Sequence, residues 1–262
     1  MARLIAEKYA AWEQLCTYRF ETLRANEEML NRIFHEIYGL QGVLSPEVET
    51  KAVSVARAEL RREIRSLISY AIGTLFGRYS LDAPGIAYAG GDWDPRRYQT
   101  IRPVEDNILI LGEAMGEEAN AATLVFQWVE RVYGAETLEE NLSFIAQALG
   151  GEGSARQVIA DYLYKDFYTD HLKIYQKRPI YWQFDAGKQG RFKALIYIHR
   201  YEPQLLQRLL ADYVQPRLAA CDALRPFANR LQKSAEQPPR LEPDDGITEN
   251  YSKFPGLLTP IR

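Results

Sequence analysis

Apolar residues recur at helical spacing through most of the chain, and this periodicity predicts a mainly helical fold. The first forty residues are expected to form one long helix that ends at Gly39. Four apolar residues at spacings of seven, three and four lie on one stripe of this helix: Leu23, Leu30, Ile33 and Ile37. Further helices are predicted over 59–76, 117–133, 137–149, 155–175 and 203–234, the last interrupted near Pro216 and Pro226. A capping box, Thr137-Leu-Glu-Glu140, is expected to open the fourth of the six.

Two runs rich in aromatic and β-branched residues predict a β-hairpin between Lys177 and Tyr201. The runs flank the turn sequence Gly-Lys-Gln-Gly at 187–190, and Trp182 and Phe192 are expected to anchor the hairpin in the core. A further short strand is predicted at 107–111. The fold class is therefore mainly α (α+β), a helical body with one hairpin near 178–199 and a few short strands.

Gly and Pro residues that interrupt the predicted helices and strands divide the chain into three parts. Residues 1–40 form the long helix, residues 41–237 form a helical module that carries the hairpin at 177–201, and residues 238–262 form a tail. The tail is Pro-rich with little periodicity, so we expect it to be extended and to wrap over a neighbour.

Composition and cysteine content narrow the class of protein. The chain is 47% hydrophobic and 26% charged, which is ordinary for a globular domain and excludes wholesale disorder. No run of about 18 apolar residues is present, so no membrane span is expected. Glu7 and Glu13 interrupt the apolar stretch that a signal peptide needs, and two cysteines are too few for a disulfide framework. These features predict a reducing, cytoplasmic setting.

The charge is unevenly distributed. The whole chain carries a formal charge of −3, yet residues 173–200 contain seven Lys or Arg against the single acid Asp185. Residues 105–152 show the opposite bias, with ten acids against Arg131. A basic, aromatic segment in an acidic protein indicates a docking surface for a polyanion. The alternative is a hairpin packed in the core, with its cations merely exposed to solvent at the edges. The acidic stretch would equally attract a basic partner.

The hairpin supplies the candidate contacts with nucleic acid. Tyr181 and Gln183 are expected on the face opposite to Trp182, which gives one apolar face and one polar face. Lys and Arg would bind phosphate, while Gln, Tyr and His would reach base or sugar edges. The predicted DNA-binding residues are Lys173, Lys177, Arg178, Tyr181, Lys188, Gln189, Arg191, Lys193, His199 and Arg200.

No complete catalytic set stands out in the sequence. A phosphate-binding loop, a dinucleotide-binding glycine motif and a nucleophile elbow are all absent, and the three histidines lack the spacing of metal ligands. Asp166 and Asp170 lie one helical turn apart beside His171, but a solvated helix face explains them better than an acid–base cluster. An independent nuclease is disfavoured, because no paired carboxylates with a nearby Lys occur at suitable spacing.

Five ordered segments resemble the C-terminal part of the PglX family, the adenine-specific DNA methyltransferases of BREX bacteriophage-defence systems. They are LNRIFHEIYGLQGVLSPEV, IRSLISYAIGTLFGRYSLDAPGIAYAGGDW, LEENLSFIAQALGG, YLYKDFYTDHLKIYQKRPIYWQFDAGKQGRFKALIYIHRY and DDGITENYSKF. The resemblance runs from about Asn26 to the end of the chain, and it leaves open whether the chain is an excised domain, a split subunit or a remnant.

The resemblance implies a module without catalytic residues. Family members hold the flipped adenine in an Asn/Asp-Pro-Pro-Tyr/Phe loop. Here the only Pro-Pro pair, Pro238-Pro239, lies between Gln237 and Arg240, so no catalytic residue is carried over. S-adenosylmethionine is expected in a catalytic domain outside this chain and no cofactor within it. The implied role is recognition or clamping of double-stranded DNA. The alternative is a scaffold that docks the methyltransferase domain or another BREX subunit.

Overall fold

The structure is a computed structural model that describes residues 3–112, 120–176, 178–239, 254 and 256–259. The described part is mainly helical with a small β component, so the predicted fold class is confirmed. The α-helices are α1 (Ile5–Tyr38), α2 (Leu60–Leu75), α3 (Ala121–Tyr133), α4 (Leu138–Leu149), α5 (Ala155–Lys165), α6 (Phe167–Ile174), α7 (Gly187–Gly190), α8 (Leu205–Arg208), α9 (Gln215–Leu218) and α10 (Arg225–Glu236).

Three short strands form one antiparallel sheet. They are β1 (Ile108–Leu111), β2 (Tyr181–Asp185) and β3 (Lys193–Tyr197), in the order β1-β3-β2. The predicted hairpin is confirmed, because β2 pairs with β3 along its whole length. The strand predicted at 107–111 is also present, and it pairs with the other edge of β3. The turn of the hairpin is the short helix α7, after which Arg191 adopts a φ of 48°.

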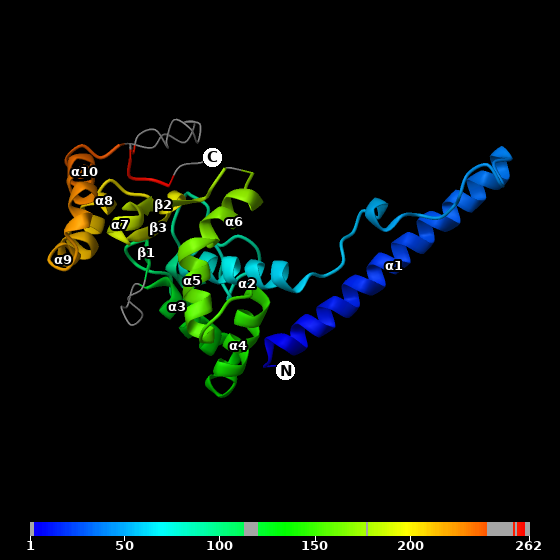
Figure 1. Cartoon of the computed structure of the whole chain (residues 1–262), viewed down its shortest axis with the longest axis horizontal. Coiled ribbons are helices and arrows are strands. Elements are labelled where there is room, and N and C mark those ends of the chain that lie inside the picture. Colours follow the sequence, from blue (N-terminus) through cyan, green and yellow to red (C-terminus); the bar gives the residue numbers. More distant parts are fainter. Residues whose placement is uncertain (1–2, 113–119, 177, 240–253, 255, 260–262) are drawn as a thin grey trace.

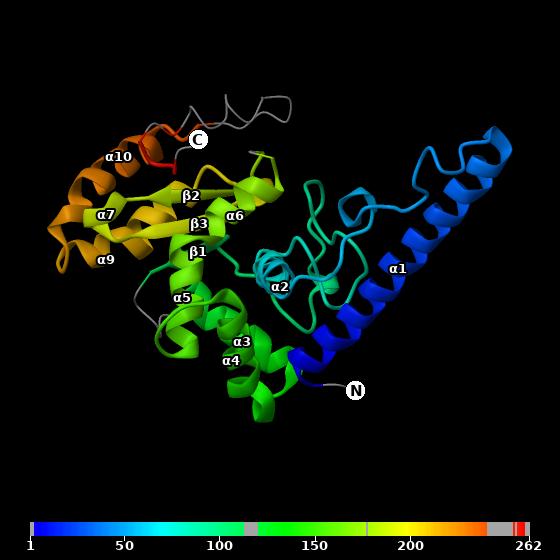
Figure 2. The ribbon, with the colours of Figure 1, turned by 45° about the vertical axis from the view of Figure 1, so that its right-hand side comes forward.

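Helices cover both faces of the sheet (Figures 1 and 2). Leu109 and Tyr181 face an apolar cluster that is built mainly from α2 to α6. Trp182 and Ile196 face a second cluster that is built mainly from α8 to α10. Trp182 and Phe192 are each 2% exposed, so their predicted core role is confirmed. The expectation of one open polar face is wrong, because alternate residues of β2 enter two different cores.

Helix α1 projects from the body as an arm (Figure 1). Its base is tied to α4, since the N–H of Ile5 donates to Asn141 Oδ1 at 2.8 Å and Asn141 Nδ2 donates to the carbonyl of Arg3 at 3.1 Å. Gly39 ends the helix with a φ of 65°, as predicted. Residues 40–59, here called the return segment, run back along the arm to α2.

Two of the predicted helices are broken in the structure. The helix expected over 155–175 divides at Asp166 into α5 and α6, which lets Phe167 bury its ring against Tyr162. The helix expected over 203–234 contains a π-helical segment, Leu209–Val214, and its described pieces α9 and α10 are separated around Cys221. Pro226 lies in the first turn of α10, where its missing N–H has no intrahelical partner to lose. Pro216 lies inside the continuous helical run from Leu205 to Leu218, two residues after the π-helical segment, so the irregularity predicted near it is present.

The starts of α3 and α4 also differ from expectation. Thr137 makes no side-chain cap, because a 3-10 turn precedes α4 and the Thr137 hydroxyl donates instead to the carbonyl of Tyr133 at 3.1 Å. The first residues predicted for α3 fall in 113–119, outside the described residues. The described helix begins at Ala121, with the side chain of Asn120 accepting from the N–H of Ala122 at 2.9 Å.

The described part of the tail extends the sheet beyond β2. The N–H of Asp185 donates to the carbonyl of Leu257 at 2.8 Å, and the N–H of Thr259 donates to the carbonyl of Gln183 at 2.9 Å. Gln183 is only 3% exposed, and its side chain donates to Thr259 Oγ1 at 2.6 Å. The tail therefore packs against a strand of its own chain and caps the free edge of β2.

Within the described residues, every helix is too short or too polar to cross a membrane.

Asn107 provides a sharp test of how β1 is held against β3. It is 3% exposed, has a φ of 62°, and exchanges two hydrogen bonds with the backbone of Tyr197 at 2.9 and 3.2 Å. We predict that Asn107→Ala lowers the free energy of unfolding by about 2–4 kcal/mol, measured by urea denaturation, because it loses both bonds. Asn107→Gly should cost about 1 kcal/mol less, since glycine tolerates the positive φ. Equal losses for the two variants would contradict this account of the position.

Candidate functional site

The structure divides the predicted DNA-binding residues among three places. Lys188, Gln189, Arg191 and Lys193 lie at the turn end of the hairpin, Lys173 and Arg178 lie at and beyond the end of α6, and Tyr181, His199 and Arg200 lie toward the opposite end of the sheet. Lys177 is outside the described residues. Strands of five residues separate the two ends of the sheet by roughly 17 Å. These residues therefore do not form one continuous surface.

The turn end carries exposed cations around an open hollow. Lys188 and Arg191 line a hollow of ≈ 600 Å³ together with Lys165 and Asp161 of α5. Lys165 pairs with Asp161 at 2.7 Å across one turn of that helix. Lys165 was not among the predicted DNA-binding residues, because only the packing of α5 beside the sheet brings it close to the hairpin. We call Lys165, Lys188 and Arg191 the turn-end cations.

Lys193 has a structural position beside this hollow. Its Nζ donates to the carbonyl of Tyr164 at 2.9 Å and lies 4.4 Å from the centroid of that ring. Asp185 lies 3.9 Å away, and the Lys193 side chain is 18% exposed. Gln189 is exposed on α7, and its carbonyl lies 3.9 Å from Cys221 Sγ.

Tyr181 belongs to the core, so the expectation that it contacts DNA is not supported by its position. It is 1% exposed, and its ring lies 5.1 Å from that of Phe76 and 4.7 Å from that of His171. Burial raises the pKa of the Tyr181 hydroxyl well above its usual value. Tyrosine has an apolar body with a polar tip, so the alternation pattern alone did not distinguish a core position from a surface one.

The remaining candidates lie near helix ends and loops. Lys173 is exposed and lies 3.6 Å from Asp170, and Arg178 is exposed just after α6. Arg200 donates to the carbonyls of Phe76 and Glu105 at 3.2 and 3.1 Å. Burial lowers the pKa of Arg200. His199 lines a hollow beside Arg200, and burial lowers its pKa too.

The Asp170–His171 neighbourhood is a structural cluster. Asp170 is 8% exposed and pairs with Arg65 at 3.0 Å while it accepts from the hydroxyl of Tyr162 at 3.2 Å. The expectation of a solvated helix face is therefore wrong for Asp170, because α2 and α5 cover it. His171 Nε2 accepts from the N–H of Ile180 at 3.1 Å instead of pairing with a carboxylate. Among the described residues, no three His, Cys, Asp or Glu gather as a metal-binding group.

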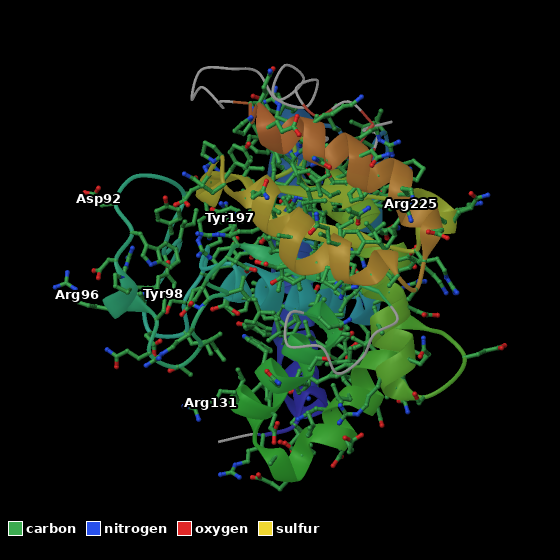
Figure 3. The ribbon with its side chains drawn as sticks, turned by 90° about the vertical axis from the view of Figure 1, so that its left-hand side faces the viewer. Asp92, Arg96, Tyr98, Arg131, Tyr197 and Arg225 are labelled. Carbon is green, nitrogen blue, oxygen red and sulfur yellow. The ribbon has the colours of Figure 1, made fainter. Side chains whose placement is uncertain are left out.

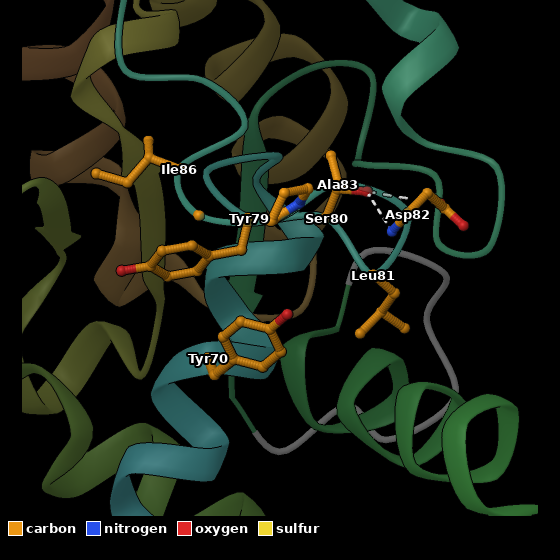
Figure 4. A pocket seen from close by; sticks show the side chains of 9 residues that line it. Tyr70, Tyr79, Ser80, Leu81, Asp82, Ala83 and Ile86 are labelled. Carbon is orange, nitrogen blue, oxygen red and sulfur yellow. Dashed lines mark hydrogen bonds between the residues drawn. The ribbon is translucent and has the colours of Figure 1, made fainter.

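A shallow hollow of ≈ 580 Å³ opens beside α2 (Figure 4). Tyr70 and Tyr79 stack there with ring centroids 5.2 Å apart. Asp82 accepts from the N–H of Thr100 at 2.8 Å and from its hydroxyl, and these bonds lower the pKa of the Asp82 carboxyl. The carboxylate thus fastens two parts of the loop together and is not available as a catalytic base.

The outer half of α1 exposes a large apolar surface. We call it the α1 stripe, and its residues are Met29, Leu30, Ile33, Phe34, Ile37 and Tyr38. Their exposed fractions run from 42% at Ile33 to 70% at Tyr38. Leu23, also on the predicted stripe, instead packs beside Phe20 against the return segment. The helical spacing identified this surface in the sequence, whereas only the structure shows that the body of the chain leaves it uncovered.

The buried His171 predicts a pH dependence of stability. Burial, with a smaller contribution from Arg78, lowers the pKa of His171 to about 3. An unfolded histidine takes up a proton near pH 6.5, whereas the folded one does not, so stability should fall as the pH drops from about 6.5 toward 3. We expect His171→Gln to reduce this slope by about 1.4 kcal/mol per pH unit in urea unfolding.

Glutamine at this position keeps a hydrogen-bond acceptor for the N–H of Ile180 but does not titrate. A smaller slope of the free energy of unfolding against pH in this variant therefore reports only the proton that unfolded His171 takes up. The control is Gln14→Ala on the exposed surface of α1, which removes no titratable group and should leave the slope as in the parent chain. An unchanged slope in His171→Gln would rule out His171 as the titrating group.

Comparison with known proteins shows which proteins this chain is similar to. The chain is 42% identical over 257 residues to the adenine-specific methyltransferase PglX of Lacticaseibacillus casei (strain Zhang). It is 32% identical over 320 aligned residues to the adenine-specific methyltransferase BrxX of Escherichia coli O9:H4 (strain HS). No family model matches the sequence.

The two alignments cover 97% and 98% of this chain but only 20% and 27% of the relatives. The chain therefore matches one region of each of these two proteins. It is similar to one region of PglX-type methyltransferases, as the ordered sequence segments indicated, and spans between a fifth and about a quarter of these relatives' length.

Proposed function

We propose that this chain is a non-catalytic docking module of a BREX adenine-specific DNA methyltransferase, and that the α1 stripe binds the remaining part of that protein. The observation that carries the proposal is the exposure of six large apolar side chains on one projecting helix. Soluble proteins rarely expose contiguous apolar surface of this kind unless it meets a partner.

The arm is built so that one side is used within the chain and the other is free to dock. On the inner side, Asn31 Nδ2 donates to the carbonyl of Pro46 at 3.1 Å, and the N–H of Val48 donates to Glu28 at 3.2 Å. Arg24 Nε adds a bond to the carbonyl of Val48 at 3.1 Å. These contacts, together with Asn141 at the base, hold α1 in place, so little ordering is needed when the stripe binds.

The alignments indicate which partner the α1 stripe would bind. Because they take in nearly the whole chain, they include the arm, while most of each relative lies outside the aligned region. A helix with an apolar stripe is suited to a hydrophobic groove on another folded part. In the two relatives the unaligned part belongs to the same molecule as the aligned region and is therefore at high effective concentration, which favours it over a separate subunit as the occupant.

We assign catalysis and S-adenosylmethionine binding to that remaining part. The supporting observation is that the only Pro-Pro pair here, Pro238-Pro239, lacks the flanking residues of an adenine-binding loop. The module would then act by holding the catalytic part in position and not by chemistry of its own.

A split-protein experiment tests the docking proposal. The Lacticaseibacillus PglX without its aligned region is mixed with this chain, and association is measured by titration calorimetry. We predict a complex, and we predict that Ile33→Glu with Ile37→Glu weakens it about 100-fold or more, because each buried Ile contributes roughly 1.5–3 kcal/mol.

The matched control is Arg32→Glu, which lies on the same turn and changes the net charge by the same two units. It should bind as the parent chain does, and circular dichroism should show that all variants fold, since the altered residues are exposed. Equal binding by the double glutamate variant would refute docking through the stripe. Assembly with another defence protein but not with PglX would refute the assigned occupant.

A second candidate function is contact with the DNA backbone through the turn-end cations. The observation in its favour is that Lys165, Lys188 and Arg191 border one open hollow on the surface. Phosphate contacts of this kind supply salt-dependent affinity and position, and sequence choice is left to other regions. The double-stranded DNA predicted from the sequence would approach this end, since the faces of the sheet are covered.

Charge reversal separates the two functions. Lys188→Glu with Arg191→Glu should weaken binding of the chain to duplex DNA at low salt by about tenfold or more, measured by fluorescence anisotropy, and should reduce the salt dependence. Lys51→Glu, an exposed cation of the return segment, is the control and should bind as the parent does. Loss of assembly with PglX but unchanged DNA binding would instead make the turn end part of the docking surface.

A further inference from the structure

The loop between α2 and β1 builds an aromatic and cationic site that is separate from both the α1 stripe and the turn-end cations. Two hollows, of ≈ 560 and ≈ 410 Å³, share three lining residues: Trp93, Glu105 and Arg200. Arg102 lines only the first hollow and Arg208 only the second. The site therefore has a shared centre and one additional guanidinium on each side.

The centre of the site is a rigid stack of planar groups. Trp93 stacks on Tyr98 with ring centroids 4.7 Å apart and an interplanar angle of 15°. The guanidinium of Arg200 lies 4.5 Å from the Trp93 centroid. Tyr88 supports Trp93 edge-on at 5.0 Å. Gly77 permits this packing, since a Cβ there would lie 2.4 Å from the indole. In Figure 3, Tyr98 points toward the body while Asp92 and Arg96 of the same loop point outward.

The charges around the stack are arranged for a ligand with both a ring and flanking anions. Within the described residues Arg200 forms no direct ion pair and is held by two backbone carbonyls, while Asp106 and Glu202, which line the second hollow, act on its charge from a greater distance. Arg102 and Arg208 likewise form no ion pair in the described part of the chain. Glu105 lies between them as an exposed hydrogen-bond acceptor.

We propose that the Trp93–Arg200 stack binds one unstacked base of a single-stranded or locally opened nucleic acid. The base lies on the outer side of the Arg200 guanidinium and beside the exposed edge of the Trp93 indole, with Glu105 accepting from a ring amino or imino group. The phosphates on its two sides lie at Arg102 and Arg208. Aromatic and guanidinium planes are the usual platforms for unstacked bases. Cations on both sides favour a strand over a free mononucleotide.

The experiment compares binding of short oligonucleotides to the whole chain by fluorescence anisotropy. We expect a labelled single strand to bind more tightly than the matched duplex. Replacing one central base by an abasic residue should weaken binding about 5–100-fold, because stacking contributes roughly 1–3 kcal/mol per base. Adenosine monophosphate should compete only weakly. Competition by the mononucleotide as strong as that by the strand would overturn the placement of phosphates on both sides.

Variants test the two parts of the site separately. Arg102→Ala with Arg208→Ala should reduce the slope of log K against log salt by roughly 1.4, about 0.7 for each cation on a single strand. Trp93→Ala should lose affinity, and Trp93→Tyr should restore most of it, which a merely unfolded loop would not allow. Arg96→Ala, an exposed neighbour that lines neither hollow, is the matched control.

Two results would overturn the proposal. One is equal affinity for the single strand with and without the central base, which would indicate backbone contact alone. The other is a loss in Arg96→Ala as large as that in the Arg102 and Arg208 variant. Neither result bears on docking through the α1 stripe, so the two proposals fail independently.

Discussion

The structure depends on burying a three-stranded sheet on both faces. β3 is the central strand, and each of its residues from Ala194 to Tyr197 is fully buried. A strand with no exposed face must be covered by helices on each side, and α2 to α6 and α8 to α10 provide that cover. The tail then closes the edge of β2. The most basic and aromatic segment of the sequence is thus mainly a core element, and its cations are restricted to its ends.

This restriction determines where the molecule can meet partners. The covered sheet leaves three surfaces: the turn-end cations, the Trp93–Arg200 stack and the α1 stripe. The first two lie at opposite ends of the sheet. The third lies on α1, which projects from the body as an arm (Figures 1 and 2). In the proposals made above, the arm would hold a partner protein while the body lies against nucleic acid. The two methyltransferases that the chain matches extend well beyond the aligned region.

The sequence predicted the helices and strands better than it predicted which of their residues are buried and what they contact. The long helix, the hairpin and the strand at 107–111 were predictable because periodicity and turn residues are local signals. Alternation also separated Tyr181 from Trp182 correctly, but it did not show that both faces are covered, since that depends on helices distant in the chain. Lys165 and Arg208 could not be assigned to sites for the same reason. The irregularities predicted near Pro216 and Pro226 are present, but proline alone did not show that the first is a π-helical segment and the second a break before a new helix.

The central claim is that the α1 stripe is a docking surface, and hydrogen exchange tests it most directly. Amide exchange is measured by mass spectrometry in this chain alone and in this chain mixed with the Lacticaseibacillus PglX that lacks its aligned region. The account predicts that amides of residues 26–44 exchange markedly more slowly in the mixture, while those of β3 are equally protected in both samples. Equal exchange of residues 26–44 in the two samples would contradict the claim.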